Sequence, residues 1–170
     1  MKMLILLCSL IPSLSFALSC ERAERMGEFM SMNGEKFMEA YKKHKSAGNK
    51  DELRVVVDDV NQARKMAYLF PALKDMGFPS VGGKGWEPFK VTMDKSSLKG
   101  MQSGWQMKNA NGDMARVRLD FDPNKGGHYN IEVFKKGPQG KEPYKLSIEF
   151  NCNGKPCTGD QIKKMAKNFN

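Results

Sequence analysis

The sequence has no apolar run long enough to span a bilayer. Its longest one, residues 3–14, is interrupted by Pro12 and by serines, whereas a membrane-spanning helix needs about 20 consecutive apolar residues. No later segment is longer or more apolar, so we expect no stable membrane span.

Residues suited to metals and to nucleotide phosphates are also scarce. There are two histidines and four cysteines, and cysteines without paired histidines make a poor zinc site. The stretch Gly82-Gly83-Lys84-Gly85 lacks the spacing and the Ser or Thr of a P-loop. We therefore expect neither a metal site nor a bound cofactor.

The amino terminus has the three parts of a secretory signal. Lys2 supplies a positive charge, an apolar stretch follows, and Ser15-Phe16-Ala17 forms a small-x-small cleavage site. We expect residues 1–17 to be removed and the mature protein to be secreted or periplasmic. A lipid anchor on Cys20 is the second choice, because Ala17 and Leu18 fit a lipidation signal poorly.

Two cysteines lie close together near the carboxyl terminus. Cys152 and Cys157 bracket a tight Asn-Gly-Lys-Pro turn. In an oxidising compartment this arrangement favours a small structural disulfide.

Residues 18–80 have the apolar spacing of helices. Over residues 21–46 the apolar side chains recur at intervals of three and four, and Asn33-Gly34 divides the stretch into two helices. A stronger helix is predicted from about Asp51, and Pro71 ends it or begins a short successor. Its apolar stripe comprises Leu53, Val56, Val57, Val60, Ala63 and Ala67.

Residues 85–170 instead alternate apolar and polar side chains, which is typical of strands. Five such segments, near residues 89–93, 105–107, 115–121, 129–133 and 144–150, predict an antiparallel meander with one buried face. Thr158 is the expected N-cap of a closing helix. The predicted fold is α+β: N-terminal helices, a meander of about five strands and a short C-terminal helix, with residues 18–170 forming one compact unit.

Positive charge is concentrated in this second half. The whole chain carries a net charge of +9, and residues 85–170 hold 15 Lys and Arg against 9 Asp and Glu. Such a surplus attracts a polyanion such as RNA. A lysine-rich surface that only keeps the protein soluble is an equally good interpretation.

Alternation places six polar side chains on one face of a hairpin. On the third strand these are Arg116, Arg118 and Asp120, and on the fourth they are His128, Asn130 and Glu132. A register that puts Asp120 beside His128 also puts Arg118 beside Asn130 and Arg116 beside Glu132. Neighbouring strands flank this solvent face with Lys145, Ser147 and Glu149 on one side and Gln106 and Lys108 on the other.

These side chains suit cleavage of RNA without a metal. The reaction needs two proton transfers and stabilisation of charge on a phosphate. We predict that Glu132 and His128 transfer the protons while Arg118 and Arg116 bind the phosphate, with Asn130 beside them. The predicted substrate-binding residues are Lys125, Lys145, Lys108 and Asp120. Alternatively, the face is an ordinary charged sheet surface with weak cross-strand pairs.

The hairpin sequence from Arg116 to Glu132, RVRLDFDPNKGGHYNIE, resembles a motif of bacterial polymorphic toxins. C-terminal nuclease domains of Rhs-type and contact-dependent-inhibition toxins have a similar pattern and are grouped with the barnase/EndoU/colicin/RelE-like ribonucleases. The resemblance covers about 20 residues well. It implies N-terminal helices before an antiparallel sheet and an active site on the open face of that sheet, with functional residues at Arg118, His128, Asn130 and Glu132. RNA, including tRNA, is the implied substrate, and an inhibitor or immunity protein is the implied partner.

Two other functions are compatible with the same residues. The first is a non-enzymatic exported protein that binds a polyanion or an acidic partner through its basic sheet face. The second is a structural envelope protein tethered through Cys20.

Overall fold

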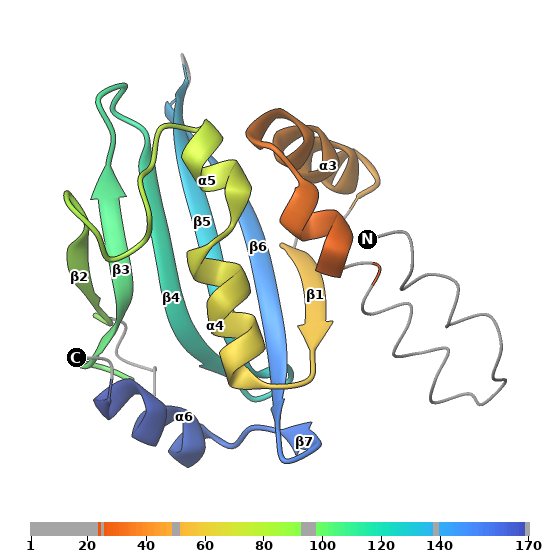
Figure 1. Cartoon of the computed structure of the whole chain (residues 1–170), viewed down its shortest axis with the longest axis vertical. Coiled ribbons are helices and arrows are strands. Elements are labelled where there is room, and N and C mark those ends of the chain that lie inside the picture. The colour runs from red at the N-terminus through yellow and green to blue at the C-terminus, as the bar shows by residue number, and fades with distance from the viewer. Residues whose placement is uncertain (1–23, 25, 49–51, 93–97, 138–139, 169–170) are drawn as a thin grey trace, which may run out of the picture.

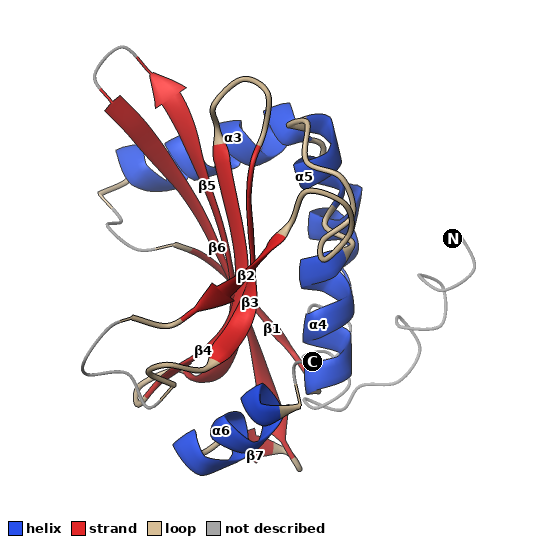
Figure 2. Ribbon diagram, turned by 90° about the vertical axis from the view of Figure 1, so that its left-hand side faces the viewer, coloured by secondary structure: helices blue, strands red, loops and turns tan. Residues whose placement is uncertain are grey.

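The computed structural model describes residues 24, 26–48, 52–92, 98–137 and 140–168. The predicted signal peptide and Cys20 lie outside these residues. A curved sheet forms one layer, and helices α4 (Val60–Tyr68) and α5 (Pro71–Asp75) form a second layer over one of its faces (Figure 1). Turned by 90°, the same helices lie together on one side of the sheet (Figure 2).

All of these helices except α4 begin at the expected signals. Residues 26–31 are helical, and Asn33 then caps α3 (Gly34–Ser46) by accepting a hydrogen bond from the Lys36 backbone N–H. Asp59 caps α4 (Val60–Tyr68) in the same way. Pro71 begins the short α5 (Pro71–Asp75). Thr158 caps α6 (Gly159–Lys167) with a complete capping box, as predicted.

The five predicted strands form an antiparallel meander, which confirms that part of the fold. They are β2 (Glu87–Lys90), β3 (Gln102–Lys108), β4 (Met114–Asp122), β5 (Gly126–Gly137) and β6 (Gly140–Cys152). A two-residue strand, β7 (Lys155–Pro156), folds back on the end of β6. With a further strand, β1 (Leu53–Val57), at one edge, the order across the sheet is β1-β6-β5-β4-β3-β2.

The strand β1 (Leu53–Val57) corrects the prediction of a helix starting near Asp51. Three consecutive β-branched valines, Val55 to Val57, favour extended backbone, and Asp59 places the helix start after them. Burial alternates along the strand: Val55 and Val57 are buried, whereas Val56 between them is exposed. β1 pairs in parallel with β6, so the segment predicted to be helical contributes a strand to the sheet of the second half.

The core lies between the sheet and the helices. Val117, Leu119, Ile131 and Val133 on the central strands are completely buried, as the alternation predicts. Phe37 of α3 packs edge-on against Phe70, with ring centroids 5.2 Å apart. This core fixes which face of β4 and β5 turns away from the helices.

The predicted disulfide joins Cys152 and Cys157. It closes the turn between β6 and α6, and it is consistent with an oxidising compartment. None of the helices in the described part of the chain is long and apolar enough to cross a membrane.

Candidate active site

The hairpin of β4 and β5 has the predicted register. Arg116 pairs with Glu132, Arg118 with Asn130, and Asp120 with His128. On the next strand Lys145, Ser147 and Glu149 lie opposite Glu132, Asn130 and His128 respectively. All these side chains share the sheet face that points away from α4.

This face is not the open solvent surface that the alternation predicts. His128 is only 4% exposed and Glu132 only 7%, because the sheet curls and flanking segments cover its centre. The result is a cavity of about 410 Å³. It is lined by Glu52, Phe89, Val91, Thr92, Arg116, Arg118, Asp120, Phe121, Asp122, Lys125, His128, Asn130, Glu132 and Lys145.

Hydrogen bonds define the protonation of His128. Its Nδ1 lies 3.1 Å from the carbonyl oxygen of Gly126, which can only accept, so Nδ1 carries the proton. The Asn130 amide nitrogen lies 3.3 Å from Nε2 and 3.4 Å from an Asp120 carboxylate oxygen, which also only accepts. Nε2 therefore accepts from Asn130, and the imidazole holds a lone pair at this atom.

Glu132 lies among three cationic groups. Its Oε2 is 3.4 Å from guanidinium nitrogens of both Arg116 and Arg118, and its Oε1 is 3.8 Å from Nζ of Lys145. Arg118 also reaches Asp120 at 3.2 Å. A continuous polar network thus runs from His128 through the arginines to Lys145.

Three buried polar atoms at this face have no hydrogen-bond partner in the described structure. They are the Nε atoms of Arg116 and Arg118 and the hydroxyl of Ser147. Buried polar atoms are nearly always paired in folded proteins. Two of these atoms belong to Arg116 and Arg118, which line the cavity.

Phe89 was predicted on the buried side of its strand but lies in this cavity. Phe89 lies opposite Gly104, and Gly104 lies opposite Arg118, so Phe89 and Arg118 are on the same face of the sheet. The register shifts between Phe89 and Lys90. The guanidinium carbon of Arg116 lies 4.3 Å from the Phe89 ring centre, so the two groups stack. Burial lowers the pKa of Arg116, and the nearby Glu132 carboxylate opposes this effect.

Glu52 is a site residue that the sequence did not single out. It precedes β1, lines the cavity and forms an ion pair with Lys125 of the β4–β5 turn. Burial alone would raise the pKa of the Glu52 carboxyl, but the hydrogen bond and charge of Lys125 hold it below its ordinary value. No pattern around residue 52 signals this contact, because it joins segments 73 residues apart.

The other predicted residues fall in different places. Lys125, Lys145 and Asp120 line the cavity, whereas Lys108 lies at the end of β3 opposite Met114 and does not line it. Glu149 is bonded to Arg54 of β1.

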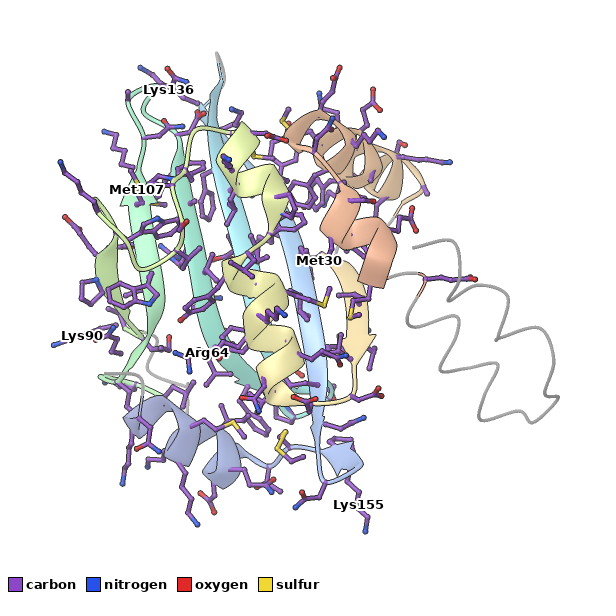
Figure 3. All side chains as sticks on the ribbon, in the orientation of Figure 1. Met30, Arg64, Lys90, Met107, Lys136 and Lys155 are labelled. Carbon is purple, nitrogen blue, oxygen red and sulfur yellow. A yellow bond between two sulfur atoms is a disulfide. The ribbon has the colours of Figure 1, made fainter. Side chains whose placement is uncertain are left out.

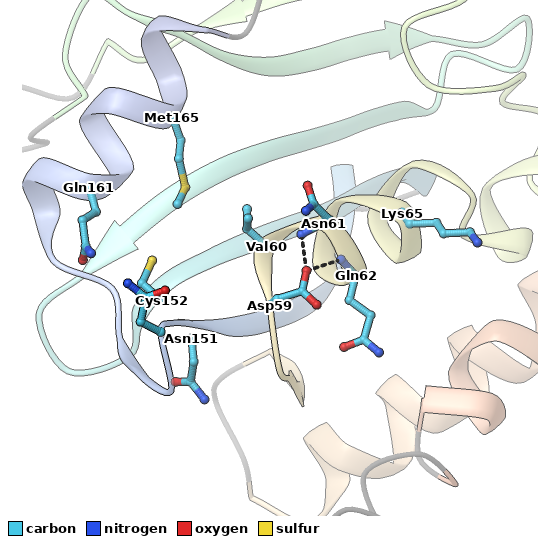
Figure 4. A pocket seen from close by; sticks show the side chains of 10 residues that line it. Asp59, Val60, Asn61, Gln62, Lys65, Asn151, Cys152, Gln161 and Met165 are labelled. Atoms are coloured by element: carbon cyan, nitrogen blue, oxygen red, sulfur yellow. Dashed lines mark hydrogen bonds between the residues drawn. The ribbon is translucent and has the colours of Figure 1, made fainter.

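A second and larger cavity, of about 610 Å³, lies between the start of α4, the end of β6 and α6 (Figure 4). Amide side chains dominate its lining. The Asp59 carboxylate there is engaged by the backbone N–H groups of Asn61 and Gln62. It lacks a histidine and an arginine, so the first cavity is the better candidate for acid–base chemistry.

In comparisons with known proteins, the sequence matches no protein-family model and no curated protein. Within the described ranges, no three His, Cys, Asp or Glu side chains are arranged to hold a metal ion.

Proposed function

We propose that this protein is a secreted ribonuclease-like toxin or effector that cleaves RNA by metal-independent acid–base catalysis in the 410 Å³ cavity. The observation that carries the proposal is one enclosed site combining His128, whose Nε2 holds a lone pair, with Glu132 and two arginines. The resemblance of the hairpin to toxin nuclease domains supports the same function.

The cavity contains a group for each chemical requirement. A base removes the proton of the ribose 2′-hydroxyl, and the 2′-oxygen attacks phosphorus. The bond from phosphorus to the 5′-oxygen then breaks, and that oxygen takes up a proton, which leaves a 2′,3′-cyclic phosphate. Arg116 and Arg118 have donors to spare for the phosphate oxygens.

His128 and Glu132 carry out the two proton transfers. Both hold a lone pair in the free protein, so the one that binds a proton before the substrate arrives is the acid. A bell-shaped dependence of kcat/KM on pH follows. In the variant that lacks the base, kcat/KM no longer falls at low pH. In the variant that lacks the acid, kcat/KM no longer falls at high pH.

The alternative is a non-enzymatic protein that binds a polyanion through its basic face. It is favoured less, because binding alone gives no role to the buried His128 and Glu132 in the cavity. Three of the lysines, Lys90, Lys136 and Lys155, lie at separate edges of the molecule (Figure 3). They do not form one shared docking face.

The test is cleavage of total RNA and tRNA by the chain lacking residues 1–17, in the presence of EDTA. We expect products with 2′,3′-cyclic phosphate ends. His128→Ala and Glu132→Gln should each lower kcat/KM by at least about 100-fold, the lower range for loss of a general acid or base.

His44→Ala is the matched control, because His44 is the other histidine and lies on α3, away from the cavity. It should retain full activity. A folded wild-type protein that binds RNA without cutting it would instead support the polyanion-binding alternative.

A further inference from the structure

The charges that line the catalytic cavity cancel one another. Four lining side chains are cationic and four are carboxylates. They are Arg116, Arg118, Lys125 and Lys145 on one side and Glu52, Asp120, Asp122 and Glu132 on the other. A phosphate that enters this cavity therefore competes with a carboxylate for every cation that it contacts.

These carboxylates are not equivalent. Glu132 contacts Arg116, Arg118 and Lys145, so losing it would disturb three cations at once. Glu52 forms its ion pair with Lys125 alone. The Glu52–Lys125 pair is thus separate from the ion pairs that Glu132 and Asp120 form with the arginines, and the charge of His128 also acts on the Glu52 carboxylate.

Distant parts of the chain make this pair. Glu52 is attached to the outermost strand β1, whereas Lys125 belongs to the β4–β5 turn two strands further in. Their side chains are only 17% and 21% exposed, so solvent screens the pair less than it would a surface pair. The lowered pKa of Glu52 keeps it ionised at neutral pH, and the charge of Lys125 is then neutralised.

We propose that Glu52 is a specificity-determining residue that competes with an RNA phosphate for Lys125 and thereby weakens binding of RNA in the cavity. The inference rests on the proposed function, since it assumes that the cavity takes a phosphodiester. While Glu52 is in place, Lys125 adds little to the affinity for RNA. Binding then depends on phosphates that reach Arg116 and Arg118. Without Glu52, Lys125 becomes a further phosphate contact.

The test measures binding to an RNA oligonucleotide with 2′-O-methyl groups throughout, which cannot be cleaved because its 2′-oxygens are blocked. Fluorescence anisotropy over a range of salt concentrations compares the wild-type protein with Glu52→Gln. One additional phosphate contact steepens the slope of log K against log salt by about 0.7 and strengthens binding about fivefold at roughly 0.1 M salt.

Glu39→Gln is the matched control for net charge. Glu39 is exposed on α3, away from the cavity, and its loss changes the net charge equally. This variant should bind like the wild type. If it gained as much affinity as Glu52→Gln, the effect would be one of overall charge and the inference would be overturned.

Lys125→Gln completes the test as a double-mutant cycle. Alone it should change the affinity by less than about twofold, because Glu52 already neutralises Lys125. In the Glu52→Gln background it should remove the whole fivefold gain. An equal effect of Lys125→Gln in both backgrounds, or no RNA binding by any variant, would overturn the inference.

Circular dichroism on each variant verifies that the fold is intact. In the double variant Glu52→Gln/Lys125→Gln, two uncharged side chains replace the ion pair. The cycle does not depend on cleavage. A protein that shows this coupling but never cuts RNA would overturn the proposed catalysis and leave the role of Glu52 standing.

Discussion

Arg116 shows how single residues keep the site rigid. Its guanidinium stacks on Phe89, with Phe134 at 5.8 Å, and also contacts Glu132. A guanidinium held by rings and by a carboxylate loses little freedom when it binds a phosphate, which favours binding. The same logic applies to His128, whose ring orientation is set by Gly126 and Asn130.

Asp113 has an analogous structural role at the opposite end of the hairpin. Its carboxylate lies 2.8 Å from Nζ of Lys135 and accepts a hydrogen bond from the Lys136 backbone N–H at 2.9 Å. Burial alone would raise the pKa of Asp113, but these contacts lower it below its ordinary value of 3.8. The folded state therefore favours the ionised form.

Asp113→Asn should accordingly lower the free energy of unfolding at pH 7 by about 1–3 kcal/mol. Because the pKa is lower in the folded state, this stabilisation is present above about pH 4 and is lost as the pH falls further. Urea unfolding of both proteins between pH 7 and pH 2.5 measures the effect. A difference that stays constant down to pH 2.5 would exclude the ionised carboxylate as its source.

At the scale of elements, the disulfide turn supports the corner of the hairpin that holds His128. A Cβ added to Gly126, whose φ is 75°, would lie 3.3 Å from Pro156 and 3.4 Å from the backbone nitrogen of Cys157. The Gly126 carbonyl in turn bonds His128. The turn closed by Cys152 and Cys157 thus packs directly behind the corner that holds His128.

Replacing Cys152 and Cys157 together by serine should lower the free energy of unfolding by about 2 kcal/mol, the chain-entropy value for so short a loop. Chemical denaturation of the oxidised protein and of the double variant gives this difference. Reduction of the wild type with dithiothreitol should produce a similar loss. A double variant as stable as the oxidised wild type would show that the turn is held by its other contacts.

On the scale of the whole molecule, β1 joins the first half of the chain to the sheet of the second half. It adds a parallel strand beside β6, and its inward side chains join the core under α4. Val55 is 2% exposed, whereas its neighbour Val56 is 37% exposed. Comparing substitutions of these two valines therefore distinguishes the effect of burial on stability from the effect of strand propensity.

Val55→Ala should lower the free energy of unfolding by about 2 kcal/mol, from two buried methyl groups and the space that they leave. Val56→Ala should change it by less than about 0.5 kcal/mol. Fluorescence of Trp86 and Trp105 reports on the second half of the chain, and far-ultraviolet circular dichroism reports on all of it. In each variant, both signals should show a single unfolding transition with the same midpoint. Separate transitions would mean that the halves fold independently.

The sequence by itself determined the local structure. Alternation defined the five strands of the meander and the face shared by Arg116, Arg118 and Asp120. The observed register is one that this alternation allows, because a side-chain period of two admits only pairings that keep Val117 and Leu119 buried. Asn33-Gly34, Pro71 and Thr158 located three of the helix starts, and the spacing of Cys152 and Cys157 located the disulfide.

Only the tertiary structure decided the conformation of β1, the shape of the cavity and the contact between Glu52 and Lys125. Five residues from Leu53 to Val57 fit a helical stripe and a strand equally well, and the free edge of β6 selected the strand. The curl of the sheet brought Phe89 over Arg116 and turned an expected open face into a cavity. Glu52 reached Lys125 only because β1 packs at that edge, since contacts between distant segments leave no periodic mark in a sequence.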